Sequence, residues 1–428
     1  MSDAKVASED PDAAVVDLQL LKDEENPYGF MYEKGIATIT FYTGDFKEAA
    51  KAIRAQFALV IAANPWLCGR LVTAKDGGVR LRYPVKPSDA DLESLFTATS
   101  AEDTDTTFKL SPNAPFSKIT SDLYASKNTI VQRGGESLDK DLPVTLLTLS
   151  ESVVGKFALV FSLSHVVGDG RTYYEVFKML QPGATARVLQ SERIQSFSEA
   201  MRDMCGRAEL ALQETVGFGM LYTFSTMFIQ PAKCVAFYLD DARVAAAKAE
   251  AVKEDGVAFV STNDIISSAF FNVCNTRLGW VGIDCRGRMD GIASDLAGNY
   301  VSALTVDEGT YKTPGTIRKM LTAPPPFVTT SRPFPSCCSW FCGRDSANFA
   351  MVTNWSSFAE DLLQIEGCEL DIHLPVMNTE EMAWDVMVPF TAQKGKKGVI
   401  CWVVNTDEEK LRKALPVGEL VSKELFCG

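Results

Sequence analysis

The chain has 428 residues, of which 46% are hydrophobic and 23% charged, so it can bury a large core, and its length suggests two domains. Its formal net charge of −13 and pI near 4.9 argue against a nucleic-acid partner, because binding phosphates requires a surplus of Lys and Arg on one face. Its 11 cysteines form no CxxC pair and have no ligand-spaced histidine, so we expect no metal site and reduced thiols in the cytoplasm.

The N-terminal residues and one apolar stretch bear on targeting. Residues 1–20 are acidic and rich in alanine, without the basic start and apolar core of a secretion signal, so we expect a short disordered leader. The longest apolar stretch, Val216–Ile229, is shorter than the about 20 residues that cross a bilayer. We therefore expect no transmembrane segment, and we interpret this stretch as buried or substrate-lining, with contact to a membrane surface as the weaker alternative.

The first half, over residues 21–185, carries clear strand and helix patterns. Gly35–Tyr42 alternates as a strand, and Phe46–Ala63 has the spacing of an amphipathic helix. Leu142–Leu149 and Phe157–Ser164 predict a hairpin. The second of these strands is an almost unbroken apolar run, which indicates that it is buried on both faces.

His165, one of only two histidines in the chain, follows this buried strand and opens an HxxxDG pattern. Gly168 and Gly170 allow the chain to turn, and Thr172–Leu180 has helical spacing. A strand, a turn and a helix would hold the imidazole on rigid supports. Histidine is the side chain that exchanges protons near neutral pH, so a general base is one interpretation. A hydrogen-bonded histidine with no chemical role fits these residues equally well.

Asp169 lies four residues after the histidine, at the start of the predicted helix. A carboxylate there interacts favourably with the helix N-terminus. We therefore expect Asp169 to fix the turn through a buried ion pair rather than to relay protons.

The two halves are expected to be joined by residues 186–245, which mix charged helical stretches with the apolar stretch. Residues 246–428 form the second half. Its first clear element is a helix over Ile265–Leu278, because Ser261–Asp264 places a hydroxyl three residues before a carboxylate, as in a capping box.

Two arginines follow the next predicted strand. Trp280–Ile283 reads as a strand and leads into Arg286 and Arg288. Without further context, two nearby arginines are most simply a solvated surface. Near the end of the chain, Gly398–Asn405 predicts a strand and Asp407–Leu415 a helix.

Six short motifs occur together in one order along the chain. They are NPWLCGRL (Asn64–Leu71), HVVGDG (His165–Gly170), STNDIISSAFF (Ser261–Phe271), DCRGRM (Asp284–Met289), GNYV (Gly298–Val301) and TNW (Thr353–Trp355). This order resembles the plant and fungal BAHD acyltransferases, which belong to the wider chloramphenicol acetyltransferase-like superfamily. The chain departs from the BAHD pattern because no DFGWG follows Trp355. Ser164 stands where wax ester synthases and condensation domains commonly have a second histidine.

The resemblance implies an α/β fold of two chloramphenicol acetyltransferase-like domains, each a mixed sheet flanked by helices, with a channel between them. It implies transfer of an acyl group from acyl-CoA to a small-molecule alcohol or amine by a monomeric enzyme. In this scheme His165 is the general base, no covalent acyl-enzyme forms, and acyl-CoA is a co-substrate rather than a bound cofactor.

The resemblance also assigns roles to residues around the histidine. Asp169 is expected to pair with Arg286 or Arg288, which the sequence does not distinguish. The expected supports of the motif are Gly168, Gly170 and Asn299, together with these arginines. Thr353 and Trp355 are expected to line the channel near the developing oxyanion, although Thr353 is equally well an ordinary strand residue.

The remaining candidates are less specific. Lys394, Lys396 and Lys397 form a basic loop that could bind the phosphates of CoA, although a lysine-rich hairpin is more often simply solvated. His373 has no motif around it, so we expect a structural role. A lipophilic acyl chain or acceptor and ordinary core packing both explain the apolar residues. Two other hypotheses stay open: an idle relative that binds a metabolite or protein, and an acyltransferase whose donor is carried on a protein.

Overall fold

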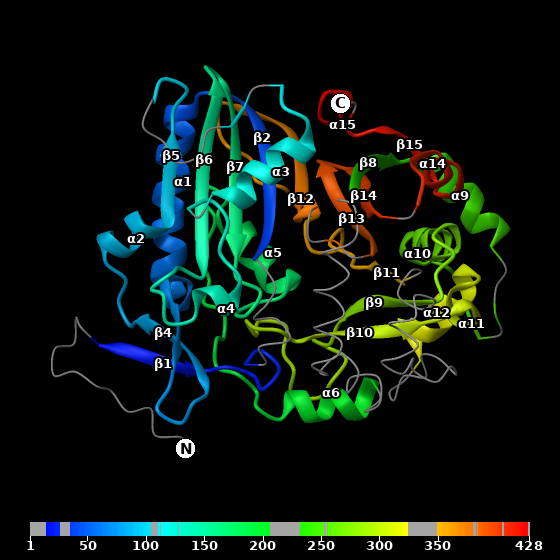
Figure 1. The fold of residues 1–428 in the computed structure, drawn as a ribbon, viewed down its shortest axis with the longest axis horizontal. Helices are drawn as coiled ribbons and strands as arrows, with labels where there is room; N and C mark the ends of the chain where they lie inside the picture. The colour runs from blue at the N-terminus through cyan, green and yellow to red at the C-terminus, as the bar shows by residue number, and fades with distance from the viewer. Residues whose placement is uncertain are drawn as a thin grey trace.

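The computed structural model describes residues 14–25, 35–103, 110–111, 113–126, 128–205, 232–251, 254, 256–323, 349–379, 382, 384–404 and 406–426. Figure 1 shows two larger sheets side by side, with helices packed against each of them. This arrangement confirms the predicted α/β class with mixed sheets flanked by helices. Among the described residues, no helix is long and apolar enough to cross a membrane.

The first sheet, on the left of Figure 1, has the order β12-β2-β7-β6-β5 in the described part of the chain. Its strands are β12 (Cys368–Val376), β2 (Ile36–Gly44), β7 (Lys156–Leu163), β6 (Thr145–Val153) and β5 (Phe96–Thr99). The helices of this half are α1 (Phe46–Ala63), the 3₁₀ helix η2 (Pro65–Cys68), α2 (Asp89–Leu95), α3 (Phe116–Ala125), α4 (Gly134–Ser137) and α5 (Gly170–Met179). A small sheet beside it has the order β1 (Val15–Gln19), β4 (Val79–Pro84) and β3 (Arg70–Thr73).

The second sheet, on the right of Figure 1, has the described order β10-β9-β11-β13-β14-β8-β15. Its strands are β10 (Val301–Val306), β9 (Leu278–Asp284), β11 (Phe349–Val352), β13 (Asp385–Gln393), β14 (Lys396–Val403), β8 (Lys233–Leu239) and β15 (Val417–Leu420). The helices of this half are α6 (Phe197–Cys205), α9 (Asp241–Glu250), α10 (Thr262–Val273), α11 (Glu308–Tyr311), α12 (Pro314–Thr322), α14 (Glu408–Ala414) and α15 (Lys423–Phe426).

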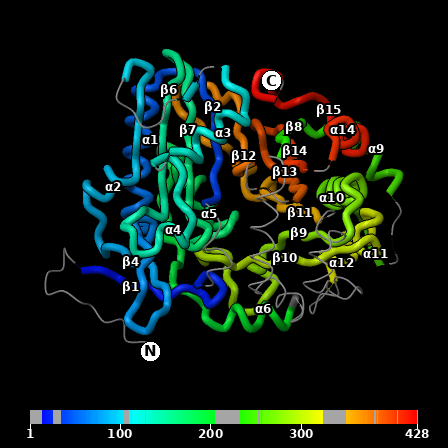
Figure 2. Tube along the Cα trace, in the orientation of Figure 1, coloured from blue at the N-terminus to red at the C-terminus, as the bar shows by residue number. Residues whose placement is uncertain are grey.

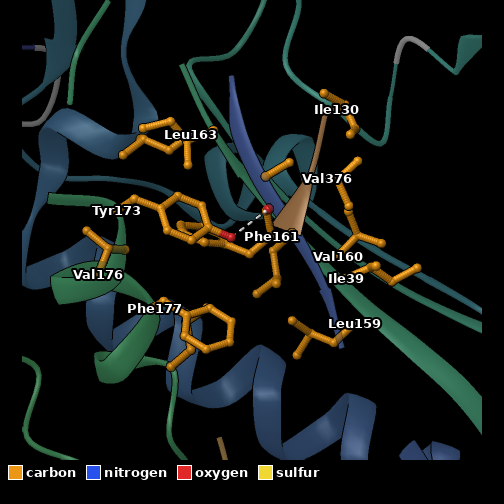
Figure 3. Close-up of a cluster of buried hydrophobic side chains, with 14 of the residues drawn as sticks. Ile39, Ile130, Leu159, Val160, Phe161, Leu163, Tyr173, Val176, Phe177 and Val376 are labelled. Carbon is orange, nitrogen blue, oxygen red and sulfur yellow. Dashed lines mark hydrogen bonds between the residues drawn. The ribbon is translucent and has the colours of Figure 1, made fainter. Parts of the chain in front are cut away.

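The core of the first half forms where α1 and α5 pack on β7. β6 and β7 pair antiparallel, which confirms the predicted hairpin, and nearly every residue of β7 is buried. From α5, Tyr173 and Phe177 point toward Phe161 of β7 (Figure 3), and the rings of Tyr173 and Phe161 have centroids 4.9 Å apart. This packing fixes the direction of the chain between the end of β7 and the start of α5.

β12 belongs to the second half by sequence but joins the first sheet. It pairs antiparallel with β2, and Figure 2 shows its orange trace beside the blue trace of β2. His373 on β12 is fully buried, with Nδ1 2.8 Å from Thr40 Oγ1 and Nε2 3.2 Å from the Tyr174 hydroxyl. Burial lowers the pKa of His373 to about 3, which agrees with the structural role expected from the sequence.

Part of the predicted leader is folded. Residues 15–19 form β1, which pairs with β4, and the carboxylate of Asp17 accepts two hydrogen bonds from Arg82. The expectation of a disordered leader over residues 1–20 is therefore wrong for this strand. A five-residue strand that pairs with one formed far along the chain carries too few alternating positions to be recognised by periodicity alone.

The predicted connection over residues 186–245 contains β8, which the sequence analysis missed. β8 lies between β14 and β15 in the second sheet. Its short apolar run gave no periodic signal that separates a strand from a buried helix. The helix predicted over Ile265–Leu278 is α10, which ends at Val273, and Val216–Ile229 lies outside the described residues.

Candidate active site

The HxxxDG segment is a tight turn between β7 and α5. Asp169 is the N-cap of α5, and its Oδ1 accepts a hydrogen bond of 2.8 Å from the Thr172 amide. A Cβ at Gly168 would lie 2.8 Å from Thr172 Cγ2, closer than packed carbons approach, so a larger residue there would displace its neighbours. A Cβ at Gly170 would meet Trp355 Nε1 at 3.5 Å, an ordinary contact.

Asp169 forms a buried ion pair with Arg286. Arg286 Nη1 lies 2.7 Å from Asp169 Oδ2 and Nη2 lies 3.3 Å from Oδ1, and both side chains are 1% exposed. Asp169 Oδ2 also accepts a hydrogen bond from the Tyr300 amide. Arg288 is exposed and donates to the Leu321 carbonyl instead. The geometry thus decides between the two arginines that the sequence left open.

The remaining donors of Arg286 hold the segment that follows Asp284. Nε donates to the Leu296 carbonyl, Nη2 to the Gly298 carbonyl, and Nη1 also contacts Asp284 Oδ1. Burial alone would lower the pKa of Arg286, but the charges of Asp169 and Asp284 and their hydrogen bonds raise it above its ordinary value. The guanidinium therefore stays charged and ties the second half to the turn that carries the histidine.

His165 contacts Asn299 from the second half. His165 Nδ1 lies 3.1 Å from Asn299 Oδ1, and Asn299 Nδ2 donates to the His165 carbonyl at 2.7 Å. Asn299 is buried, whereas His165 is partly exposed to a cavity. The side chain of Asn299 thus holds both the ring and the backbone of the histidine.

A cavity of about 360 Å³ lies between the two halves. His165, Tyr124 and Ile36 line it from the first half, and Trp280, Met351, Val301, Trp384 and other mostly apolar side chains line it from the second. An apolar cavity with a few polar groups is the usual form of a small-molecule site.

The segment Thr353–Trp355 follows β11 and lines this cavity, with Trp355 next to Gly170 of the HxxxDG turn. The backbone amides of Thr353 and Trp355 donate to the carbonyls of Met387 and Pro389 on β13. The ring of Trp355 packs edge to face against Tyr174 of α5, with centroids 6.0 Å apart. Both predicted channel residues are therefore held at the cavity by backbone and ring contacts.

The lysine loop lies away from the cavity. Lys394, Lys396 and Lys397 are exposed at the turn between β13 and β14, and the ammonium of Lys396 lies over the ring of Tyr238. Val386 lines the cavity from the start of β13, and at roughly 3.3 Å per residue the turn at Lys394 lies about 26 Å farther along the strand. The described residues include no cluster of side chains that could hold a metal ion.

Sequence reasoning missed two charged pairs near the histidine. Arg171 Nη1 lies 3.3 Å from Asp284 Oδ2, and both residues line the cavity. The other pair, Glu24 and Arg193, is buried and contacts Asn299 and the HxxxDG turn. Arg171 directly follows the motif and could have been singled out, whereas nothing in the sequence links Glu24 to Arg193.

No family model and no curated protein matches the chain. Its fold is similar to that of solved acyltransferase and condensation-domain structures, which confirms the fold expected from the motifs. TRI101 of F. graminearum, complexed with coenzyme A and deoxynivalenol, aligns with a TM-score of 0.59 at 13% identity, over 95% of this chain and 100% of that one.

Two further solved structures share the fold. Polyketide synthase associated protein 5 from M. tuberculosis has a TM-score of 0.56 at 13% identity, over 94% of this chain and 97% of its own. The first condensation domain of the CDA synthetase has a TM-score of 0.54 at 12% identity, over 93% of each chain. At these identities the likeness establishes the fold and leaves the reaction to be argued from the site.

Proposed function

We propose that the chain is an acyltransferase that moves an acyl group from acyl-CoA to the hydroxyl, or the amine, of a small-molecule acceptor, with His165 as general base. The observation that carries this proposal is the position of His165: it follows a buried strand, lines the cavity between the halves, and has Nδ1 bonded to Asn299. The shared fold of TRI101, crystallised with coenzyme A and either deoxynivalenol or T-2 mycotoxin, supports both the donor and the kind of acceptor.

The proposed transfer is direct. The acceptor oxygen attacks the thioester carbonyl while its proton moves to the imidazole of His165. The tetrahedral intermediate then expels the CoA thiolate, which takes the proton back from the imidazolium. The products are the ester and free CoA, the histidine returns to its starting state, and no covalent acyl-enzyme is needed.

Thr353 and Trp355 are proposed to stabilise the charge that develops on the thioester oxygen. Both line the same cavity as His165, and the hydroxyl of Thr353 can donate a hydrogen bond. One such donor is worth about 3 kcal/mol in the transition state. Asp169 is proposed to support the turn rather than to accept a proton, since its two oxygens already accept from Arg286 and two backbone amides.

The likeness to condensation domains favours one second candidate, an acyltransferase whose acyl donor is carried on a protein. Both candidates use the same base and differ in what enters the cavity. A cytoplasmic location and a monomeric state stay predictions from the sequence, and no permanently bound cofactor is part of the proposal.

The test is to incubate the purified protein with a panel of acyl-CoAs and small alcohols and amines and to measure free thiol release and acylated product. We expect transfer by the wild type and a loss of about 10²-fold or more in His165→Ala, the range that a general base contributes. The matched control is His373→Gln, which changes the other histidine, on β12, and should keep the activity at a temperature where it is folded. Undiminished transfer by His165→Ala would contradict the mechanism.

A further inference from the structure

Glu24 and Arg193 form a buried ion pair on the far side of Asn299 from the catalytic histidine. Arg193 Nε lies 2.9 Å from Glu24 Oε2, and the two side chains are 1% and 0% exposed. Glu24 comes from the segment between β1 and β2, upstream of every motif quoted above. Burying two charges costs free energy, which indicates that the contacts of the pair with its neighbours have a role.

Arg193 links the two segments that build the site. Nη2 donates to the Val167 carbonyl within the HxxxDG turn at 2.9 Å, and Nη1 donates to the Ala297 carbonyl at 2.7 Å. Its guanidinium also lies against Gly298, and a Cβ added at this glycine would lie 3.0 Å from it. Arg193 thus fixes where the carboxylate of Glu24 stands relative to Asn299.

In the described part of the chain, the hydrogen-bond partners of the Glu24 carboxylate are all donors. Oε1 accepts from both the backbone amide and Nδ2 of Asn299, at 2.9 and 3.0 Å, and Oε2 accepts from Arg193 Nε and the Leu21 amide. A carboxylate is the side chain that can accept on both oxygens. A glutamine at this position would turn an NH₂ group toward other donors whichever way its amide lies.

These contacts fix the orientation of the Asn299 amide. Nδ2 faces three acceptors, Glu24 Oε1 and the carbonyls of His165 and Val166. Reversing the amide would place its oxygen against all three, so Oδ1 must be the atom that faces His165 Nδ1. An oxygen there requires a proton on Nδ1, and in the neutral ring Nε2 is then the unprotonated nitrogen.

We propose that Glu24, held by Arg193, is a positioning residue that sets the tautomer of His165 through Asn299. The ion pair orients the amide, the amide keeps the proton on Nδ1, and Nε2 is the atom that accepts the acceptor's proton. This inference rests on the proposed function, in which His165 is the general base. It assigns a role in the reaction to a residue outside every motif of the sequence.

The test uses the two histidines of the chain as spectroscopic probes. Protein labelled with ¹⁵N-histidine contains only two imidazoles, and the signals that disappear in His165→Ala identify His165. The two ring nitrogens give widely separated ¹⁵N shifts according to which one carries the proton. The spectra are recorded near pH 8.5, about two units above the ordinary pKa of histidine. We expect the wild type to show only the Nδ1–H form at His165.

The informative variants are Glu24→Gln and Asn299→Ala. Each should give a mixture of tautomers at His165 while His373 is unchanged, and Glu24→Gln should lower kcat about tenfold or more with a much smaller change in KM. If Glu24→Gln does not fold, the double variant Glu24→Leu with Arg193→Leu removes both charges together, a replacement that proteins often tolerate.

The matched control is Asp264→Asn, which removes a carboxylate that is 1% exposed and paired with Arg318 in the second half, outside the cavity lining. It should lower stability without changing the tautomer or kcat. An unchanged Nδ1–H form in the folded Glu24 variant would overturn the inference. The spectra can be recorded whether or not the protein has transferase activity. If the protein has no transferase activity but Glu24→Gln loses the Nδ1–H form, the positioning role is supported and the proposed function is refuted.

Discussion

The ion pair between Asp169 and Arg286 should matter more for stability than for proton transfer. Both partners are buried and hydrogen-bonded on several sides. Removing Arg286 leaves Asp169 as an uncompensated buried charge, whereas removing Asp169 leaves Arg286 paired with Asp284 alone. We expect Arg286→Ala to lower the free energy of unfolding by about 3 to 5 kcal/mol, and Asp169→Ala to lower it by less, measured by urea denaturation. Arg288→Ala, an exposed neighbour, should stay within about 0.5 kcal/mol of the wild type. Equal effects at both arginines would contradict this role.

Gly168 should be intolerant of even one added methyl group. A Cβ added at Gly168 would lie 2.8 Å from Thr172 Cγ2, and overpacking in a buried site costs about 1 to 3 kcal/mol. We expect Gly168→Ala to show that loss in urea denaturation and Thr172→Ser, which removes Cγ2 but keeps the hydroxyl, to restore part of it in the double variant. Gly170→Ala, whose Cβ meets only ordinary contacts, is the control. A failure of Thr172→Ser to restore any stability would show that the strain lies elsewhere.

At the residue scale, the sequence identified the groups that belong to a local pattern. His165 and Asp169 stand together in six residues, and the turn they form follows from the strand, glycines and helix around them. Arg286 was one of two candidates, because choosing between it and Arg288 depends on how the second half packs. Glu24 and Arg193 are 169 residues apart, and no periodicity or spacing connects positions at that distance.

At the element scale, predictions succeeded where the local sequence itself determines the ends. α1 has the predicted bounds, with Asp45 capping its first amides, and α10 begins with the predicted capping box at Ser261. β1 and β8 were missed because their partners, β4, β14 and β15, lie elsewhere in the chain. Short strands are specified by the neighbours they pair with, which sequence patterns do not reveal.

His373 makes the packing of β12 dependent on pH. Burial lowers its pKa from 6.5 to about 3 in the folded protein, so between these values the unfolded chain binds a proton that the folded chain does not. Stability therefore falls as pH falls through this window, by about 1.4 kcal/mol per pH unit from this group. We expect His373→Gln to lose that part of the slope in urea denaturation between pH 6.5 and 4.5. Identical slopes in the two proteins would show that His373 is not kept neutral.

At the scale of the whole molecule, the cavity depends on both halves at once. β12 returns from the second half to pair with β2, and Asp169 and Arg286 join the halves beside the histidine. Asn299, from the second half, contacts the ring of His165. His165 is therefore placed by contacts that neither half contains alone, which is why the sequence could predict the motif but not its surroundings.

These shared contacts predict that the two halves unfold together. Leu374 on β12 is fully buried opposite Ile39 of β2, and Leu374→Ala should cost about 2 to 5 kcal/mol. In native-state hydrogen exchange under urea, we expect peptides from β6 and β7 and peptides from β13 and β14 to lose protection by equal amounts, because a cooperative unit opens with one free energy. Leu411→Ala, at the buried residue of α14 in the second half, should likewise lower protection in both sheets. If Leu374→Ala lowers protection in the first sheet alone, the halves are separate folding units, and the histidine is placed by docking of two folded parts instead of by a shared core.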